Sequence, residues 1–361
     1  MVGAGPQASF AAAHAQGETD ADWGRLALDC VSQLGPAADR AELGFLYVTD
    51  ALAAHLPKIV ALLRQSTGVK AWAGSVGVGI AASGAEYFDC PAMAVLVASL
   101  PNDAWRLIPN LERADPESAA NPEFGAGPLA AVRQWADARA GGPLGGLPLG
   151  VVHADPRNPQ LPQLVTALAD AVSAFLVGGL ASSRGSMDQV SGETVVRGGV
   201  SGVLFAPDMA IATGLSQGCS PIGPVRSVTA ARQNVVFEID GRPALEVFKQ
   251  DIGEVLARQL EKVAGYIHAA FPVTGDDTGD YLVRNLVGID PERGWLAVGE
   301  RVAPGDRILF VRRDRAAAEE DLVRMIRRLK RGATASPKAG IYFSCVARGP
   351  NMFGPRATQE K

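Results

Sequence analysis

The sequence has few cysteines. Its four, Cys30, Cys90, Cys219 and Cys345, are spread over 361 residues and none lies near another. Zinc sites and thiol redox motifs require closely spaced pairs. We therefore expect no metal bound through thiolates and no cofactor held by them. Thiols of this kind are typical of a reducing compartment, so we expect a cytoplasmic protein.

An excess of charge of one sign is also missing. The chain has 34 Lys and Arg against 38 Asp and Glu, which gives a net charge of -4. Nucleic-acid binding depends on a positive surface that neutralises phosphates. The one basic cluster, from Arg324 to Arg331, is short and belongs to an expected helix, where a solvated face explains it. We expect no nucleic-acid partner.

Long hydrophobic runs and a secretory signal are absent. No uncharged stretch reaches the roughly 18 to 20 apolar residues of a membrane span. The first ten residues lack the basic region that opens a signal peptide. We expect a soluble protein without membrane insertion.

What the sequence does contain is a duplicated pattern. Apolar residues make up 47% of the chain and charged ones 20%, as in globular proteins. Residues 44–50 are typical of a buried strand ending in Asp50, residues 51–66 have helical periodicity, and residues 71–76 are typical of a second strand. Much later, residues 150–155 repeat the first strand and end in Asp155.

The second copy continues in the same order. Residues 161–173 predict a helix and residues 174–180 a strand, and Asp50 precedes Gly74 by 24 residues, as Asp155 precedes Gly179. The repeats extend over about 44–100 and 150–206, with an irregular linker at 101–149. We predict a mixed α/β fold of internally duplicated βαβ-type units, with mixed sheets packed against helices, and a C-terminal α/β part.

The remaining pattern is rich in strands. We expect strands at 209–215, 225–230 and 234–239, then one long helix at 244–271. Further predicted elements are strands at 281–288, 295–298 and 307–311, a helix at 316–330, and a strand that ends near Phe343.

Two short segments resemble motifs of cofactor-binding or catalytic sites. Residues 77–82 imitate a dinucleotide fingerprint, but the helix that this motif requires is missing, so we do not expect dinucleotide binding. Residues 73–77 resemble a degraded nucleophile elbow around Ser75, for which His153 is a candidate base. His153 lies inside an expected strand, where a structural role is commoner. A glycine-rich strand exit can still offer backbone amides to a small ligand.

The segment from Phe343 to Gly354 joins a thiol, a guanidinium and a glycine turn. Arginine offers a planar fork of donors that suits carboxylate or phosphate, and glycine lets backbone approach a ligand. We therefore expect the rim of a small-molecule pocket. Cys345 as a nucleophile would need a nearby base, which the sequence does not place.

Several segments together resemble the FIST family. They are Gly74-Ser75-Val76-Gly77, Val225 to Thr229, Phe237 to Leu245 with its Asp-Gly-Arg-Pro-Ala-Leu string, and Phe343 to Gly349 with its Cys-x-x-Arg-Gly string. The likeness runs from about Phe10 to the end of the chain. Members usually continue through another helix and strand, so we expect the C-terminal domain to be shortened.

The resemblance implies a sensory protein with a FIST N-type domain at 1–253 and a FIST C-type domain at 254–361. It implies a cytoplasmic sensor of small molecules such as amino acids, with no output domain of its own and a separate signalling partner. We expect no enzyme activity, and the alternative is a thiol or serine hydrolase using Cys345 or Ser75. The predicted ligand-binding residues are Ser75, Gly77, Gly178, Cys345, Arg348, Gly349 and Asn351.

Overall fold

The chain packs as two compact units. The computed structural model describes residues 8–101, 103–113, 129–139, 146–258, 260–263, 266–272 and 281–354. The first unit comprises residues 1–211 and 335–361, and the second comprises residues 212–334. The last part of the chain therefore returns to the first unit.

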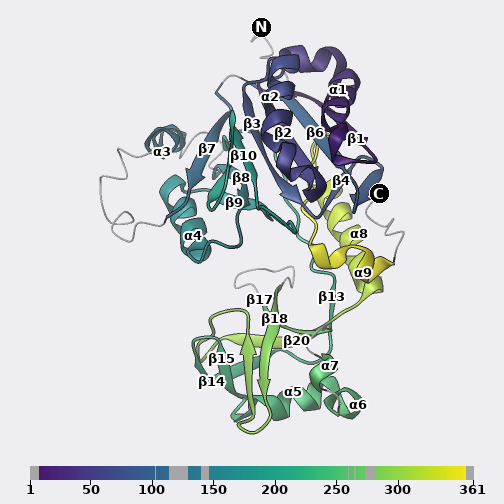
Figure 1. Ribbon diagram of the computed structural model, residues 1–361. Helices are drawn as coiled ribbons and strands as arrows, with labels where there is room; N and C mark the ends of the chain where they lie inside the picture. The colour runs from purple at the N-terminus through teal and green to yellow at the C-terminus, as the bar shows by residue number, and fades with distance from the viewer. Residues whose placement is uncertain are drawn as a thin grey trace. The chain divides into compact units, whose positions relative to one another are not determined.

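The first unit contains two sheets (Figure 1). One has six strands in the order β1-β6-β2-β3-β10-β11, and the strands β2 and β3 are parallel because the helix α2 carries the chain across between them. Their bounds are β1 Ser9–Gln16, β2 Leu43–Thr49, α2 Leu56–Thr67, β3 Ala71–Gly77, β6 Ala92–Ser99, β10 Gln189–Gly192 and β11 Thr194–Val196.

The other sheet has four strands in the order β7-β12-β8-β9, and here α4 joins the parallel pair β8 and β9. The bounds are β7 Trp105–Leu111, β8 Leu149–Ala154, α4 Leu161–Val172, β9 Phe175–Leu180 and β12 Val200–Phe205. Each sheet therefore has a strand, a crossover helix, a parallel strand and a later antiparallel strand. The predicted mixed α/β fold with an internal duplication is confirmed.

The register corrects the predicted alignment of the two copies. Gly74 lies opposite Leu46, and Gly178 lies opposite Val152. A Cβ atom on either glycine would come 1.8 Å or 1.9 Å from the carbonyl oxygen of its partner, so both positions require glycine for the same reason. Gly178, not Gly179, is the counterpart of Gly74.

The two sheets face each other, with helices outside. Side chains alternate along a strand, so each sheet has one face toward the other sheet and one toward helices. Phe45 and Val203 share the core between the sheets. Leu46 packs toward α1 (Trp23–Leu34) and α2, and Val152 packs toward α3 (Ala130–Asp137) and α4 (Figure 1).

Hairpins extend both copies. The strands β4 (Gly79–Ala82) and β5 (Ala85–Phe88) pair with each other after the first copy. In the second copy, β10 leaves its own sheet and pairs with β3 of the first. This strand pairing links the two copies.

The second unit is built on a sheet that closes on itself. Its strands follow the order β13-β20-β14-β15-β19-β18-β17, and β17 also pairs with β20. The apolar interior includes Val236, Phe248 and Phe310. The bounds are β13 Cys219–Pro221, β14 Arg226–Arg232, β15 Val235–Ile239, β16 Arg242–Pro243, β17 Ile267–Pro272, β18 Tyr281–Asp290, β19 Trp295–Val298 and β20 Arg307–Arg313.

Three predicted elements are wrong, and the linker predicted to be irregular at 101–149 contains the strand β7, which pairs with β12. The expected helix at 244–271 is α5 (Ala244–Ile252), α6 (Glu254–Ala257), α7 (Leu260–Val263) and then the strand β17. Gly253, at φ +81°, ends α5 because that backbone conformation lies outside the helical region. No strand forms at 209–215, and the stretch before Phe343 is not a strand either. The helix expected at 316–330 is present as α8 (Arg315–Gly332).

Candidate functional site

The end of the chain lies against the first unit. We call residues 341–349 the C-terminal strap. Ile341 and Phe343 pack on the core between the two sheets, and Gly349 lies 3.4 Å from the Phe88 ring, measured from the position of a Cβ atom. The strap therefore reaches from the core between the sheets to the hairpin of β4 and β5.

Beneath the strap, Tyr47 and His153 meet between the sheets. Tyr47 lies on β2 and His153 lies on β8. Tyr47 directly follows Leu46, which is opposite Gly74, and His153 directly follows Val152, which is opposite Gly178. The Tyr47 hydroxyl and His153 Nε2 are hydrogen-bonded at 3.0 Å. The Phe343 ring centroid lies 5.8 Å from that of His153 and 6.3 Å from that of Tyr47.

Burial controls the protonation of this pair. His153 is 1% exposed, and burial lowers its pKa to about 4, so the ring is neutral near pH 7. Burial also raises the pKa of Tyr47 above its usual range. Since Nε2 meets the Tyr47 hydroxyl, the second ring nitrogen, Nδ1, is left buried with no hydrogen-bond partner among the described residues.

Ser75 lies beside Tyr47 on β3 and is buried. Its hydroxyl donates to the Val76 carbonyl at 3.0 Å, and in the described residues no histidine is hydrogen-bonded to it. The Ser75 and His153 pair required by a nucleophile elbow is therefore not assembled. Gly77 ends β3, where a Cβ atom would come 2.6 Å from the Gly79 carbonyl oxygen.

The exits of β3 and β9 are joined by hydrogen bonds. The Ser182 amide donates to the Val76 carbonyl at 3.2 Å, and the Val78 amide donates to the Ser182 hydroxyl at 3.0 Å. Ser182 follows β9, so one short segment of each copy contacts the other. Phe343 lies against Gly179 on β9, next to the predicted residue Gly178.

The remaining predicted residues lie on the strap or directly after it. Cys345 is exposed. Arg348 is 9% exposed, and its guanidinium carbon lies 5.7 Å from the centroid of the Phe353 ring. Gly349 is buried against Phe88. Asn351 belongs to the short helix α9 (Pro350–Phe353), and its side chain lies outside the described part.

A buried polar cluster escaped the sequence-based prediction. The Ser201 hydroxyl donates to Gln189 Oε1 at 2.8 Å, and Gln189 Nε2 donates to the Gly199 carbonyl at 3.0 Å. Ser201 lies opposite His153 in the sheet, and Gln189 lies opposite Ser75. Polar side chains at matching places in buried strands, such as Tyr47 and His153, are the signal that could have revealed this region.

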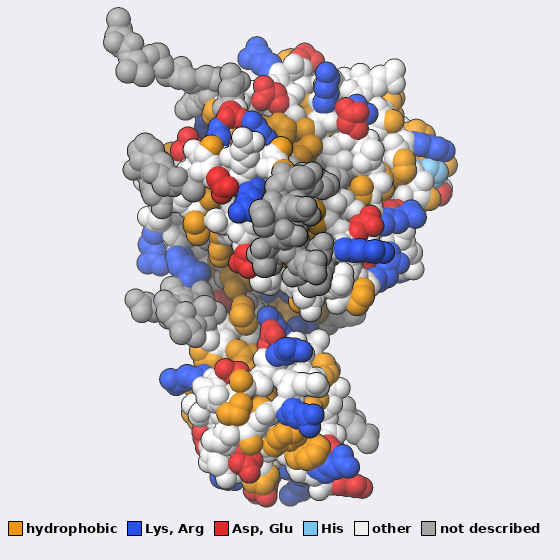
Figure 2. All heavy atoms as spheres, turned by 90° about the vertical axis from the view of Figure 1, so that its left-hand side faces the viewer, with side chains coloured by type: hydrophobic (Ala, Val, Ile, Leu, Met, Phe, Trp, Pro, Cys, Tyr) orange, Lys and Arg blue, Asp and Glu red, His pale blue; other side chains and the backbone are white. Residues whose placement is uncertain are grey.

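The described residues were also compared with the requirements of metal sites, membrane spans and charged binding surfaces. No group of three or more His, Cys, Asp or Glu side chains there is placed to hold a metal ion. Among the helices described, none is both long and apolar enough to cross a bilayer. On the face shown in Figure 2, basic and acidic side chains are interspersed.

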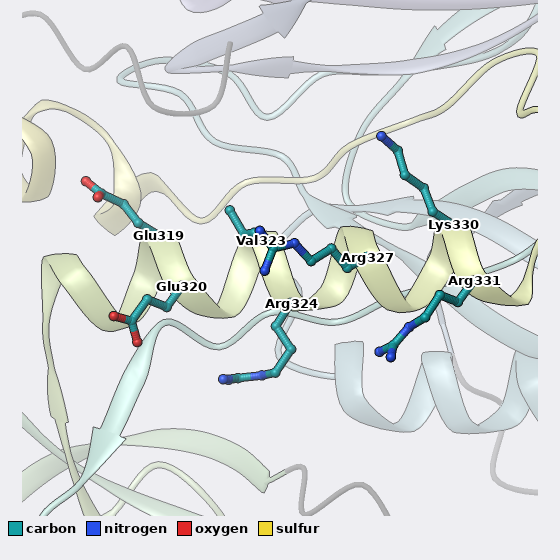
Figure 3. A pocket seen from close by; sticks show the side chains of 7 residues that line it. All are labelled: Glu319, Glu320, Val323, Arg324, Arg327, Lys330 and Arg331. Atoms are coloured by element: carbon teal, nitrogen blue, oxygen red, sulfur yellow. The ribbon is translucent and has the colours of Figure 1, made fainter.

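One open depression lies away from the predicted residues. It has a volume of about 850 Å³ and lies over α8 in the second unit (Figure 3). A single helix surrounds no ligand, so this is a helix surface and not an enclosed site. Its lining residues are Glu319, Glu320, Val323, Arg324, Arg327, Lys330 and Arg331.

Comparisons with known proteins identify the family. Residues 42–242 match the FIST N domain, and residues 244–361 match the FIST C domain. Two uncharacterized proteins from Mycobacterium tuberculosis strains are each 33% identical over 195 residues, which cover 51% of this chain and 50% of theirs. An uncharacterized protein of Mycobacterium bovis is 30% identical over 192 residues, with the same coverage.

The chain therefore spans about half the length of the curated relatives it matches. FIST domains are sensory domains that bind small ligands in signalling. With both domain matches present in order along the chain, this protein belongs to the FIST family.

Proposed function

We propose that this protein is a cytoplasmic sensor that binds a small ligand, of the amino-acid class or a related metabolite, in its first unit. The observation that carries the proposal is His153, whose Nδ1 is buried under the ring of Phe343 and has no hydrogen-bond partner in the part of the chain that the structure describes. An unpaired buried polar atom costs free energy that a ligand atom can recover by hydrogen bonding.

The ligand would take the place of the Phe343 ring. Phe343 is only partly buried and lies in residues 341–345, the part of the strap that precedes its short 3-10 helix (Val346–Arg348) and forms no regular secondary structure. A ligand that bonds His153 Nδ1 would displace this ring and shift the population of strap conformations. A separate signalling protein would then recognise the changed strap.

Arg348 would anchor an anionic group of the ligand. Its guanidinium is buried beside Phe353, and a carboxylate there would meet a charge in surroundings of low dielectric. Ser75, Gly77, Gly178, Gly349 and Asn351 would shape the site. Cys345 would contribute as an exposed neighbour, and we propose no catalytic role for it or for Ser75.

A thermal-shift screen of free amino acids and related metabolites tests this proposal. We expect at least one compound to raise the melting temperature of the first unit. Arg348→Ala should lower the affinity for that compound by roughly tenfold and so reduce the shift in melting temperature. Arg40→Ala is the matched control, since Arg40 is exposed and has no ion pair among the described residues.

Arg348→Lys covers the case in which the alanine variant does not fold, because it keeps the charge and loses the planar fork of donors. A screen in which no compound stabilises the protein would contradict the proposal. So would a stabilising compound that binds the Arg348 variants as tightly as it binds the wild type.

A further inference from the structure

The helix α8 of the second unit exposes an apolar strip. Val323 is 43% exposed and Ile326 is 41% exposed, whereas Ala318 and Met325 are buried on the other side of the helix. Exposed apolar side chains that adjoin one another on a helix are a common feature of helix-pairing surfaces. The depression over α8 includes this strip at Val323.

The strip continues into charged residues of opposite sign. Glu319, Val323, Ile326 and Lys330 follow one another at spacings of four, three and four residues, which is the seam of a coiled-coil helix. In Figure 3, Glu319, Val323 and Lys330 point to the same side of the helix. The seam is acidic at its start, apolar in the middle and basic at its end.

This order is self-complementary in an antiparallel arrangement. The pair Glu319 and Lys330 and the pair Val323 and Ile326 have the same midpoint along the helix. A two-fold axis at that midpoint would place each Glu319 against the Lys330 of a second copy, and each Val323 against Ile326. We propose that α8 is the self-association surface of this protein, with a second copy of the chain as its partner.

Flanking residues add a second pair of contacts. Glu320 and Arg327 lie one position after Glu319 and Ile326, beside the seam. In antiparallel coiled coils, charged residues in these flanking positions of the two helices face each other. Glu320 of one copy would therefore lie near Arg327 of the other.

Ion pairs within one chain do not occupy the charged residues of this surface strongly, so these residues can pair with a second copy. Glu319 accepts from Arg315 at 3.0 Å, an exposed pair within the helix that contributes little to stability. Among the described residues, Arg327 and Lys330 make no ion pair. A wholly acidic partner or an anionic membrane would attract the basic end but would be repelled by Glu319 and Glu320, which is why the surface fits a second copy better.

The surface is small, so the association is expected to be weak, with a Kd on the order of 100 μM. Sedimentation velocity of the full chain, over concentrations that bracket this value, should show a monomer–dimer equilibrium. Glu319→Lys and Lys330→Glu each place like charges in contact, and we expect each to weaken association by about tenfold.

Mixing the two variants is the decisive experiment. Glu319→Lys has lysine at both positions and Lys330→Glu has glutamate at both, so the mixture should form a heterodimer at least as tight as the wild type. Arg331→Glu is the control for Lys330→Glu, because it makes the same change in charge at a position outside the seam; in Figure 3 the Arg331 and Lys330 side chains point to opposite sides of the helix. Circular dichroism verifies that each variant is folded.

A wild-type chain that stays monomeric over this range would overturn the proposal. Failure of the mixture to associate would also overturn it, as would equal weakening by Arg331→Glu.

Discussion

At the scale of single residues, His153 gives the most specific prediction, which concerns the pH dependence of stability. Its ring is buried between two sheets, with one nitrogen bonded to Tyr47 and the other without a described partner. Such a group is stable only while neutral, because burial penalises the charged form. The protonation of this one side chain should therefore appear in the stability of the first unit.

We expect the free energy of unfolding of that unit to fall as the pH drops from about 6.5 toward 4. The unfolded state binds a proton near pH 6.5, whereas the folded state binds it only near 4, so acid favours unfolding in this window. The loss should approach about 3 kcal/mol at the lower end. Denaturant unfolding at a series of pH values measures it.

His153→Phe provides the comparison, because phenylalanine keeps a planar ring and does not titrate. The difference in stability between wild type and this variant should change across the window, while Tyr47→Phe, which retains His153, should keep a pH dependence. A difference between wild type and His153→Phe that stays constant with pH would show that His153 is not the titrating group.

The contact between Tyr47 and His153 could not be predicted from the sequence. These residues are 106 positions apart and lie in different sheets, and strand periodicity does not specify which sheets stack. The sequence-based interpretation of His153 as a structural strand histidine agrees with its place on β8. That its Nδ1 is buried with no partner among the described residues could be learned only from the packed structure.

At the scale of elements, the two crossover units depend on Gly74 and Gly178. Each lets the parallel strand approach its neighbour so closely that a Cβ atom would overlap a backbone carbonyl oxygen. Backbone cannot yield as a flexible side chain can. The paired glycines therefore have a packing role, whether or not Gly178 also contacts ligand.

We expect Gly74→Ala and Gly178→Ala each to destabilise the first unit by about 3 kcal/mol or more, since the strands must separate. Gly24→Ala is the matched control. Gly24 lies in α1 with nothing within 4 Å of a Cβ atom, so alanine there should be neutral or stabilise by up to about 1 kcal/mol. Thermal unfolding compares the three, and equal stability of all three variants would refute the packing role.

The duplication could be predicted because both copies have the same strand, helix and strand periodicity. The predicted alignment matched Asp50 with Asp155 and Gly74 with Gly179, but the crossover of the second copy is two residues shorter: Leu46 and Gly74 are 28 positions apart, whereas Val152 and Gly178 are 26. The predicted alignment was therefore wrong by one residue at each of the two strands. The helix predicted at 244–271 failed because the apolar residues at 267–271 fit a buried strand as well as a helix.

At the scale of the whole molecule, family domains and compact units divide the chain differently. The two family matches meet near residue 243, inside the second unit, and the FIST C match continues into the strap of the first. A cut at that point would remove β13, β14 and β15 from the closed sheet. The predicted division at residue 253 stays a prediction.

The return of the chain to the first unit gives the strap its proposed role. The described residues 335–354 belong to the first unit, although they follow α8 of the second along the chain. A ligand that moves Phe343 would therefore act on a segment of the first unit that follows the second unit closely in the sequence. The sequence indicated the importance of this segment but placed it in a strand, because its packing partners lie nearly 200 to 300 residues earlier.

The most direct test of the proposed site is ¹⁵N NMR of the full chain labelled at its four histidines. His153→Phe assigns the signal of His153, and the compound found in the thermal-shift screen is then titrated in. We expect the Nδ1 resonance of His153 to shift with the ligand, while those of His55 and His268 stay in place. A compound that binds and leaves the His153 resonances unchanged would contradict the account.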